Sequence, residues 1–308
     1  MEKALTREAY GKTLAKLGET NQFYVMDADL AGSTQTEIFR KKYPERFIQC
    51  GIAEANMVNM AAGIASTGIP VFVSSYAIFT SGRCWEQIRT SVAYPKLNVK
   101  IAATHAGITV GEDGASHQCC EDISLMRSIP NMLVVSPADA TEAALATEAI
   151  LNYDGPAYLR LSRSSSPVIF DENYKFELGK GVVVKEGNDI VIFSTGIVLS
   201  EVIEAANLLE QQGHNVAVIN IHTIKPIDTE LIIKYATKCK QAFTVEEHSI
   251  IGGFGSAVCE VTSENAPIKV TRIGTKDVFG SSGDPKGMFK RFELDSEGIV
   301  KAILNNLK

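Results

Sequence analysis

The chain has 308 residues, of which 45% are hydrophobic and 21% are charged, which is typical of a globular protein with about two domains. A net charge of −6 without any basic run gives no indication of nucleic-acid binding, and no apolar stretch is long enough to span a bilayer. The charged N-terminus lacks the apolar core of a signal peptide and the six cysteines form no CxxC pair, so we expect a cytoplasmic protein with reduced thiols.

The first half of the chain alternates short β-rich runs with amphipathic segments of helical length. Strands are predicted at 23–28, 71–75, 99–104, 132–136 and 157–161, and the clearest helix is predicted at 139–152. Such alternation predicts α/β architecture with a largely parallel sheet.

A polar stretch at 162–180, rich in serine and mixed charge, predicts a connection between two domains. A second alternating series follows, with strands predicted at 189–195, 215–221, 241–247 and 269–274, and helices at 198–212, 229–238 and 254–265. We therefore expect one domain at 1–165, a linker at 166–185 and a second domain at 186–308, each a mostly parallel sheet flanked by helices.

Polar residues follow the predicted strands of the first domain, where ligands gather in open α/β sheets. The densest group is THAGITVGEDGASHQ at 104–118, which holds two of the five histidines. Taken alone, this stretch fits an ordinary glycine-rich surface loop equally well. A metal site built from His105, Asp113, His117 and Cys119 is a further reading, but their spacing matches no standard zinc pattern.

Three other features are ambiguous when each is taken by itself. Glu54 opens a small-residue helix, where a carboxylate either complements the helix N-terminus or faces a ligand. Tyr76 and Phe79 stand three residues apart and so share one side of a helix or turn, a spacing that usually belongs to the core. The candidate anion binders are arginines, which suit phosphate when the guanidinium is held in place. They are Arg7, Arg160 and Arg163.

Together these segments resemble the transketolase family in order and spacing, over almost the whole chain. The matching motifs are LTREA at 5–9, DADLAGS at 27–33, GIAE at 51–54, HAGITVGEDGASHQ at 105–118 and LSR at 161–163. The chain is similar to the pyrimidine-binding domain and the C-terminal domain of a transketolase. It resembles deoxyxylulose-phosphate synthase slightly less closely.

The resemblance implies thiamine diphosphate as cofactor, and it assigns roles to several residues. Glu54 would hydrogen-bond the aminopyrimidine ring nitrogen and favour the imino tautomer, whose imino group then deprotonates the thiazolium carbon. Tyr76 and Phe79 would stack on the pyrimidine, and Asp29 would lie near the cofactor. His117 would assist the proton transfers of catalysis.

The resemblance also implies a sugar-phosphate substrate. Charge-assisted bonds to phosphate would come from a clamp, and such bonds are stronger than neutral ones. The clamp would consist of Arg7, Ser33, His105 and Arg163. Asp113 would read a substrate hydroxyl. This set favours transfer of a two-carbon ketol unit from a ketose phosphate to an aldose phosphate.

The chain lacks the GDG motif with which full-length transketolases bind the cofactor diphosphate through a metal ion. We therefore expect no metal ligand in this chain, and we expect Mg²⁺ or Ca²⁺ to be held by an N-terminal subunit. The expected assembly is a heterotetramer with two copies of each chain and cofactor sites at interfaces. The isolated chain should be inactive.

Several alternatives stay open. The chain could be a deoxyxylulose-phosphate-synthase-like subunit, the β-type subunit of a 2-oxoacid dehydrogenase, or a non-catalytic family member. The loop at 105–118 and the retained Glu54 favour the transketolase reading. In the second domain Glu246, Glu247 and His248 end a predicted strand, and such residues either bind something or are simply solvated.

Overall fold

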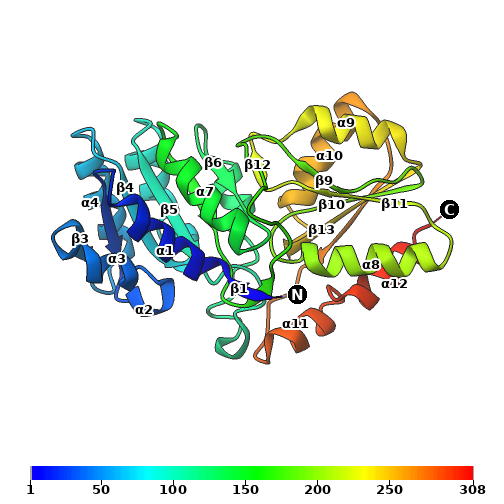
Figure 1. Cartoon of the computed structure of the whole chain (residues 1–308), viewed down its shortest axis with the longest axis horizontal. Coiled ribbons are helices and arrows are strands. Elements are labelled where there is room, and N and C mark those ends of the chain that lie inside the picture. Colours follow the sequence, from blue (N-terminus) through cyan, green and yellow to red (C-terminus); the bar gives the residue numbers. More distant parts are fainter. Residues whose placement is uncertain (1, 308) are drawn as a thin grey trace.

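Runs of aliphatic residues that are buried along their whole length form the centre of the first domain. The computed structural model describes residues 2–307 and has two α/β lobes side by side (Figure 1). The first sheet has seven strands in the order β12-β6-β7-β5-β4-β2-β3. The strands that pair in parallel are β2 (Tyr24–Asp27), β3 (Phe47–Gln49), β4 (Val71–Tyr76), β5 (Val99–Thr104), β6 (Leu133–Val135) and β7 (Ala157–Arg160).

Helices cover both faces of this sheet because alternate strand residues point to opposite sides. In β4, Phe72 packs in the cluster beneath α1 (Thr6–Leu17), α3 (Glu37–Lys42) and α7 (Ala140–Asn152). Val71 and Val73 pack on the other face. That face carries α4 (Glu54–Ala65), α6 (Asp122–Arg127) and two π-helical segments, Ile78–Arg83 and Ile88–Ala93, joined by α5 (Trp85–Gln87). The short α2 (Ala31–Thr34) follows β2.

The second domain repeats this architecture around five strands in the order β14-β13-β10-β11-β9. Its strands are β9 (Val182–Lys185), β10 (Ile190–Ser194), β11 (Val216–Asn220), β13 (Gln241–Ser249) and β14 (Val270–Thr275), with β9 antiparallel. Ile190 and Ile192 face α8 (Leu199–Gln211) and α12 (Ser296–Leu304), whereas Val191 and Phe193 face α9 (Thr229–Lys238) and α10 (Phe254–Asn265). The predicted fold class, two mostly parallel sheets flanked by helices, is confirmed.

The segment predicted as a linker is not all irregular. β8 (Ser165–Pro167) pairs antiparallel with β1 (Lys3–Leu5), so it ties the end of the first domain back to the N-terminus. β9 is the antiparallel edge of the second sheet. The domain boundaries themselves stay a prediction. Among residues 2–307, no helix is both long and apolar enough to cross a bilayer.

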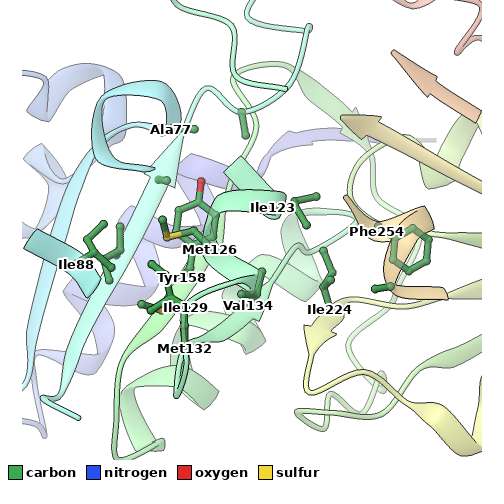
Figure 2. Packing of buried hydrophobic residues seen from close by; sticks show 14 of the residues in the cluster. Ala77, Ile88, Ile123, Met126, Ile129, Met132, Val134, Tyr158, Ile224 and Phe254 are labelled. Carbon is green, nitrogen blue, oxygen red and sulfur yellow. The ribbon is translucent and has the colours of Figure 1, made fainter. Parts of the chain in front are cut away.

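The two domains share one of the hydrophobic clusters. Figure 2 shows Ile224 and Phe254 of the second half beside Ile123 and Val134 of the first, and all four belong to one cluster. β12 (Thr223–Lys225), which lies beyond β11 in the sequence, completes the edge of the first sheet by pairing with β6. The cluster at this seam also contains Ala106, near the start of the loop at 105–118, so the second domain can influence where that loop sits.

Candidate functional site

The carboxyl ends of neighbouring parallel strands bring the predicted site residues together. β2, β4 and β5 pair in register and end at Asp27, Tyr76 and Thr104. Asp29 stands two residues after the end of β2 and His105 directly after β5, and both have left-handed backbones, with φ of 66° and 59°. Such conformations are uncommon outside glycine and cluster at functional sites. This edge of the sheet is therefore the place to look for a site.

Four aromatic side chains pack together there. The Tyr76 ring stacks on His105 with centroids 3.8 Å apart, and on Phe79 at 5.8 Å. His117 meets Tyr76 and Phe79 edge to face, at 6.1 and 5.5 Å. The structure thus brings together the two predicted stacking residues and the two histidines of the loop, although they come from segments up to about forty residues apart.

Glu54 lies beside this cluster as the first residue of α4, and its side chain is 2% exposed. Arg83 donates from Nη1 to Glu54 Oε2 at 2.7 Å, and the same guanidinium lies 4.8 Å from the centroid of the Phe79 ring. Sequence reasoning missed Arg83, because nothing in its local context distinguishes it from a surface arginine. A flat ring that approached Glu54 and Phe79 would compete with the Arg83 guanidinium for these two contacts.

Asp29 is exposed, and its position is set by two residues that sequence reasoning also missed. Gln49 Oε1 accepts a hydrogen bond from the Asp29 amide at 2.8 Å. The buried Asp27 accepts from the Leu30 amide at 2.6 Å and from the Thr34 hydroxyl at 2.7 Å, and burial raises its pKa. Asp27 lies within the DADLAGS motif but was predicted only as a strand residue, and the short strand that ends at Gln49 was not predicted.

The two arginines of the predicted clamp lie near Tyr76 and His105. Arg7 donates from Nη1 to the Ser33 carbonyl at 2.5 Å, so Ser33 contributes its main chain here. Burial and the positive charge of Arg163 lower the Arg7 pKa. Burial, together with Arg7 and Arg163, lowers the pKa of His105 to about 3, so this histidine is neutral near pH 7. Like charges held this close favour an anion between them.

Arg163 and Asp113 lie at the loop side of the site. Arg163 donates to Glu112 Oε2 at 2.7 Å, and Glu112 and Asp113 belong to one short turn at 111–113. Glu112 is 61% exposed at its side chain and Asp113 is exposed as well. An anionic ligand would therefore compete with Glu112 for Arg163 while Asp113 stays accessible.

Two interpretations of the sequence are wrong. Arg160 is not an anion binder, because it is 6% exposed and donates to Asp122 Oδ2 at 2.8 Å and to the Glu247 carbonyl at 2.9 Å. Glu246, Glu247 and His248 are not solvated, because each is at most 2% exposed.

The reading of His105, Asp113, His117 and Cys119 as a metal site finds no support in the geometry. Within residues 2–307, no group of three or more His, Cys, Asp or Glu side chains is arranged to hold a metal ion. All six cysteines are free thiols, and the buried Cys119 lies 3.7 Å from the Ser81 hydroxyl.

Comparison with known proteins explains this arrangement. Residues 2–168 match the family model described as the transketolase pyrimidine binding domain, and residues 179–299 match the transketolase C-terminal domain. The chain belongs to the transketolase family. Transketolases depend on thiamine diphosphate. Glu54, Tyr76 and Phe79 lie in the domain whose family description names pyrimidine binding.

Similar proteins of nearly the same length are known. A putative transketolase C-terminal section from Methanocaldococcus jannaschii is 49% identical over 306 residues, which is 98% of this chain and 96% of that protein. A 6-deoxy-6-sulfo-D-fructose transketolase subunit from a Clostridium species is 39% identical, over 98% of this chain and 94% of its own. A solved structure described as a split gene transketolase, inactive beta4 tetramer, aligns with a TM-score of 0.91 and 46% identity, covering 98% and 97% of the two chains. The predicted family is thus confirmed, whereas the roles given to single residues stay predictions.

Proposed function

We propose that this chain is the C-terminal subunit of a thiamine-diphosphate-dependent transketolase that is active only with an N-terminal partner. It would transfer a two-carbon ketol unit from a ketose phosphate to an aldose phosphate. One observation carries the proposal. The buried Glu54 carboxyl pairs with Arg83, which lies over Phe79, and the charges of Arg7 and Arg163 act on His105. Phe79 and His105 both stack on Tyr76, so these rings connect the Glu54 carboxyl at one end to the arginines at the other. A cofactor ring and a sugar phosphate would fit these two ends.

The residues near Glu54 suit the aminopyrimidine of the cofactor. The Arg83 guanidinium lies over the Phe79 ring, and the flat ring of the cofactor could replace it there. Tyr76 stacks on both Phe79 and His105 and so helps to hold the Phe79 ring in position. Glu54 would hydrogen-bond the ring nitrogen, and Asp29 would lie nearby. The cofactor, when bound, supplies the nucleophilic carbon that takes up the two-carbon unit. This chain would orient it and, through His117, move protons on the substrate.

The opposite end would take the anionic end of the sugar. Arg7, His105 and Arg163 would bind its terminal group, Ser33 would hold Arg7 in place, and Asp113 would bind a hydroxyl. A phosphate dianion is the first candidate. A sulfonate is the second, because a relative at 39% identity is described as a subunit that acts on a sulfo-fructose. Both are terminal anions that two guanidiniums can hold.

The partner would be an N-terminal subunit in a heterotetramer with two copies of each chain, located in the cytoplasm. It would hold the cofactor diphosphate together with Mg²⁺ or Ca²⁺. Support comes from the similar proteins, one described as a C-terminal section and the other as a split gene transketolase that forms an inactive tetramer. By analogy with that inactive tetramer, this chain should be inactive without its N-terminal partner.

The test is to co-express the chain with a candidate N-terminal subunit that contains GDG, add thiamine diphosphate and Mg²⁺, and assay ketol transfer. Phosphorylated and sulfonated donors are compared. In the active complex we expect Glu54→Gln to lower kcat by at least about a hundredfold, since the buried carboxyl is replaced by a neutral amide. Glu45→Gln, whose carboxylate is 67% exposed, is the matched control.

Two results would reverse the proposal. A complex that decarboxylates pyruvate but transfers no ketol unit would identify a 2-oxoacid dehydrogenase component. Wild-type kcat in Glu54→Gln would remove Glu54 from the chemistry.

A further inference from the structure

The second domain contacts the loop at 105–118, here called the substrate loop, through hydrogen bonds at two places. The Gln118 amide donates to the Ser281 carbonyl at 2.9 Å at the end of the loop, and the Glu247 carboxylate reaches its middle. Glu247 lies in β13 and is 2% exposed. Its Oε1 accepts hydrogen bonds from both the amide and the hydroxyl of Thr109, each at 2.7 Å. Thr109 is 138 residues away in the sequence and lies in the middle of the loop. Two donors on one charged acceptor make this a strong contact.

The loop is shaped to receive this carboxylate. Gly107 has φ of +79°, and a Cβ added there would lie 2.3 Å from Glu247 Oε1. Only glycine allows the backbone to approach so closely in this conformation. The Gly107 amide also donates to the Cys119 carbonyl at 2.8 Å, which closes the base of the loop. Glu247 therefore sits against the point where the loop begins and ends.

The other side of Thr109 is held by the first domain. The Ser164 hydroxyl donates to the Thr109 carbonyl at 2.8 Å, and Ser164 is the immediate neighbour of Arg163. Thr109 is thus fixed between Glu247 and the strand end that carries the predicted anion-binding arginine. Arg163 in turn pairs with Glu112 of the same loop. A shift at Thr109 would move both partners of that pair.

The position of Glu247 carries an energetic cost. Its second oxygen, Oε2, is buried and has no hydrogen-bond partner among residues 2–307. Burial raises its pKa, and the nearby Arg160 opposes that rise. A buried carboxylate with one unpaired oxygen destabilises a fold, and such departures occur where function needs them.

The neighbours of Glu247 on β13 make other contacts: Glu246 bonds within the second domain, and His248 Nε2 accepts from the Ser124 amide of α6 at 3.5 Å. Glu246 accepts hydrogen bonds from the Phe254 and Gly255 amides, at 2.6 and 2.8 Å, and so caps α10. His248 bonds the Ser249 carbonyl at 2.7 Å. Of these three consecutive residues, Glu247 is the one whose carboxylate bonds the loop.

We propose that Glu247 is a positioning residue for the substrate loop, through which the second domain sets where Arg163, Asp113 and His117 stand relative to the sugar. This inference rests on the proposed function for its effect on substrate, but the contact itself does not. The C-terminal domain would then tune substrate binding rather than only support assembly. Changes at Glu247 should act on the Michaelis constant of the sugars and leave the cofactor concentration for half-maximal activity unchanged.

The test uses Glu247→Gln, which keeps the shape but removes the charge, and Thr109→Val, which removes the hydroxyl from the loop side. In the two-chain complex each should raise KM for the sugar substrates by about fivefold, the size expected for losing part of a charge-assisted bond. The double variant should raise KM by less than the product of the two single effects, because both changes act on one shared contact. Glu246→Gln, equally buried on the same strand, should lower thermal stability but leave KM within about twofold.

A second measurement does not depend on activity. Hydrogen exchange of the full chain should be several-fold faster in the 105–118 peptide for Glu247→Gln and Thr109→Val, and unchanged there for Glu246→Gln. Wild-type exchange in both loop variants, or KM effects that multiply in the double variant, would overturn the positioning role. If the wild-type complex transfers no ketol unit, the proposed function fails, and the exchange result alone decides the loop contact.

Discussion

Arg163 joins two parts of the candidate substrate site that are far apart in the sequence. It pairs with Glu112 at 2.7 Å and contributes to the lowered pKa of both Arg7 and His105. An anionic sugar would exchange the exposed Glu112 for its own terminal group. In the active complex, Arg163→Ala should therefore raise KM for phosphosugars by about tenfold or more, because a charge-assisted pair is lost. Steady-state kinetics with varied sugar, and separately with varied cofactor, measure this.

The cofactor concentration for half-maximal activity should stay unchanged in this variant, since Arg163 pairs with Glu112 of the loop whereas Glu54 pairs with Arg83. Arg40→Ala serves as the control, because Arg40 is an exposed residue of α3 that pairs with Glu37. Equal KM values in Arg163→Ala and the wild type would remove Arg163 from the clamp.

The partners of single residues were the part of the site that the sequence could not reveal. Motifs such as GIAE and LSR identify Glu54 and Arg163 by position alone. The pairing of Glu54 with Arg83 depends on how the π-helical segment at 78–83 folds over α4, and no local pattern encodes that turn. The prediction of Arg160 as an anion binder was wrong for the same reason, because its hydrogen-bond partner Asp122 is 38 residues away in the sequence.

At the scale of elements, long buried segments were predicted well and short edge strands were not. The strand predicted at 99–104 and the helices predicted at 229–238 and 254–265 have the same bounds in the structure. Their hydrophobic periodicity is strong enough to define them locally. β3 and β12 have three residues each and were missed. Such strands are stabilised by the sheet they join, so their own sequence carries little signal.

The start of α7 is an element whose stability depends on one side chain. Asp139 caps the helix, because its Oδ1 accepts from the Glu142 amide at 2.8 Å. Its Oδ2 accepts from the Ile169 and Phe170 amides, at 2.6 and 2.8 Å, and so holds the connection between the domains. Asp139→Ala should lower the free energy of unfolding by about 2 to 3 kcal/mol, as a lost cap leaves further amides unpaired.

Asp295→Ala gives the matched comparison, because Asp295 caps α12 with a bond to the Gly298 amide at 3.1 Å. Loss of a cap alone costs about 1 kcal/mol. Urea titrations of the full chain, extrapolated to water, should rank the two variants in this order. Equal losses would show that the bonds to Ile169 and Phe170 add nothing.

At the scale of the whole molecule, the arrangement of the two domains decides what the second one does. The sequence predicted both sheets and the order of the site residues, but it gave no signal for the shared cluster or for the strand β12 that crosses the seam. Contacts such as that of Glu247 with Thr109 join residues more than a hundred positions apart. Such contacts depend on how the two domains pack, and no local sequence pattern predicts that packing.

A buried carboxyl on this seam should make the stability of the molecule depend on pH. Glu142 of α7 accepts from the Tyr174 hydroxyl at 2.6 Å and from the Asn220 amide nitrogen of β11 at 2.9 Å, so it bonds the domain connection and the second sheet. Burial raises its pKa from 4.5 to about 7, and the neighbouring Asp139 adds to the rise. Between these two values the folded protein binds more protons at this site than the unfolded chain does.

The sign follows from that difference. The contribution of Glu142 to stability is full below pH 4.5 and is lost as the pH rises through about 7. The stability of the wild type relative to Glu142→Gln should therefore fall by about 2 to 3 kcal/mol between pH 4.5 and pH 8. Urea titrations at several pH values measure it, and groups common to both proteins, such as His222 and His248, cancel in the difference. Glu148→Gln, an exposed change on the same helix, should give a flat difference. A flat difference for Glu142→Gln as well would mean that the Glu142 carboxyl has the same pKa in the folded and unfolded states. Water would then reach this carboxyl despite its burial.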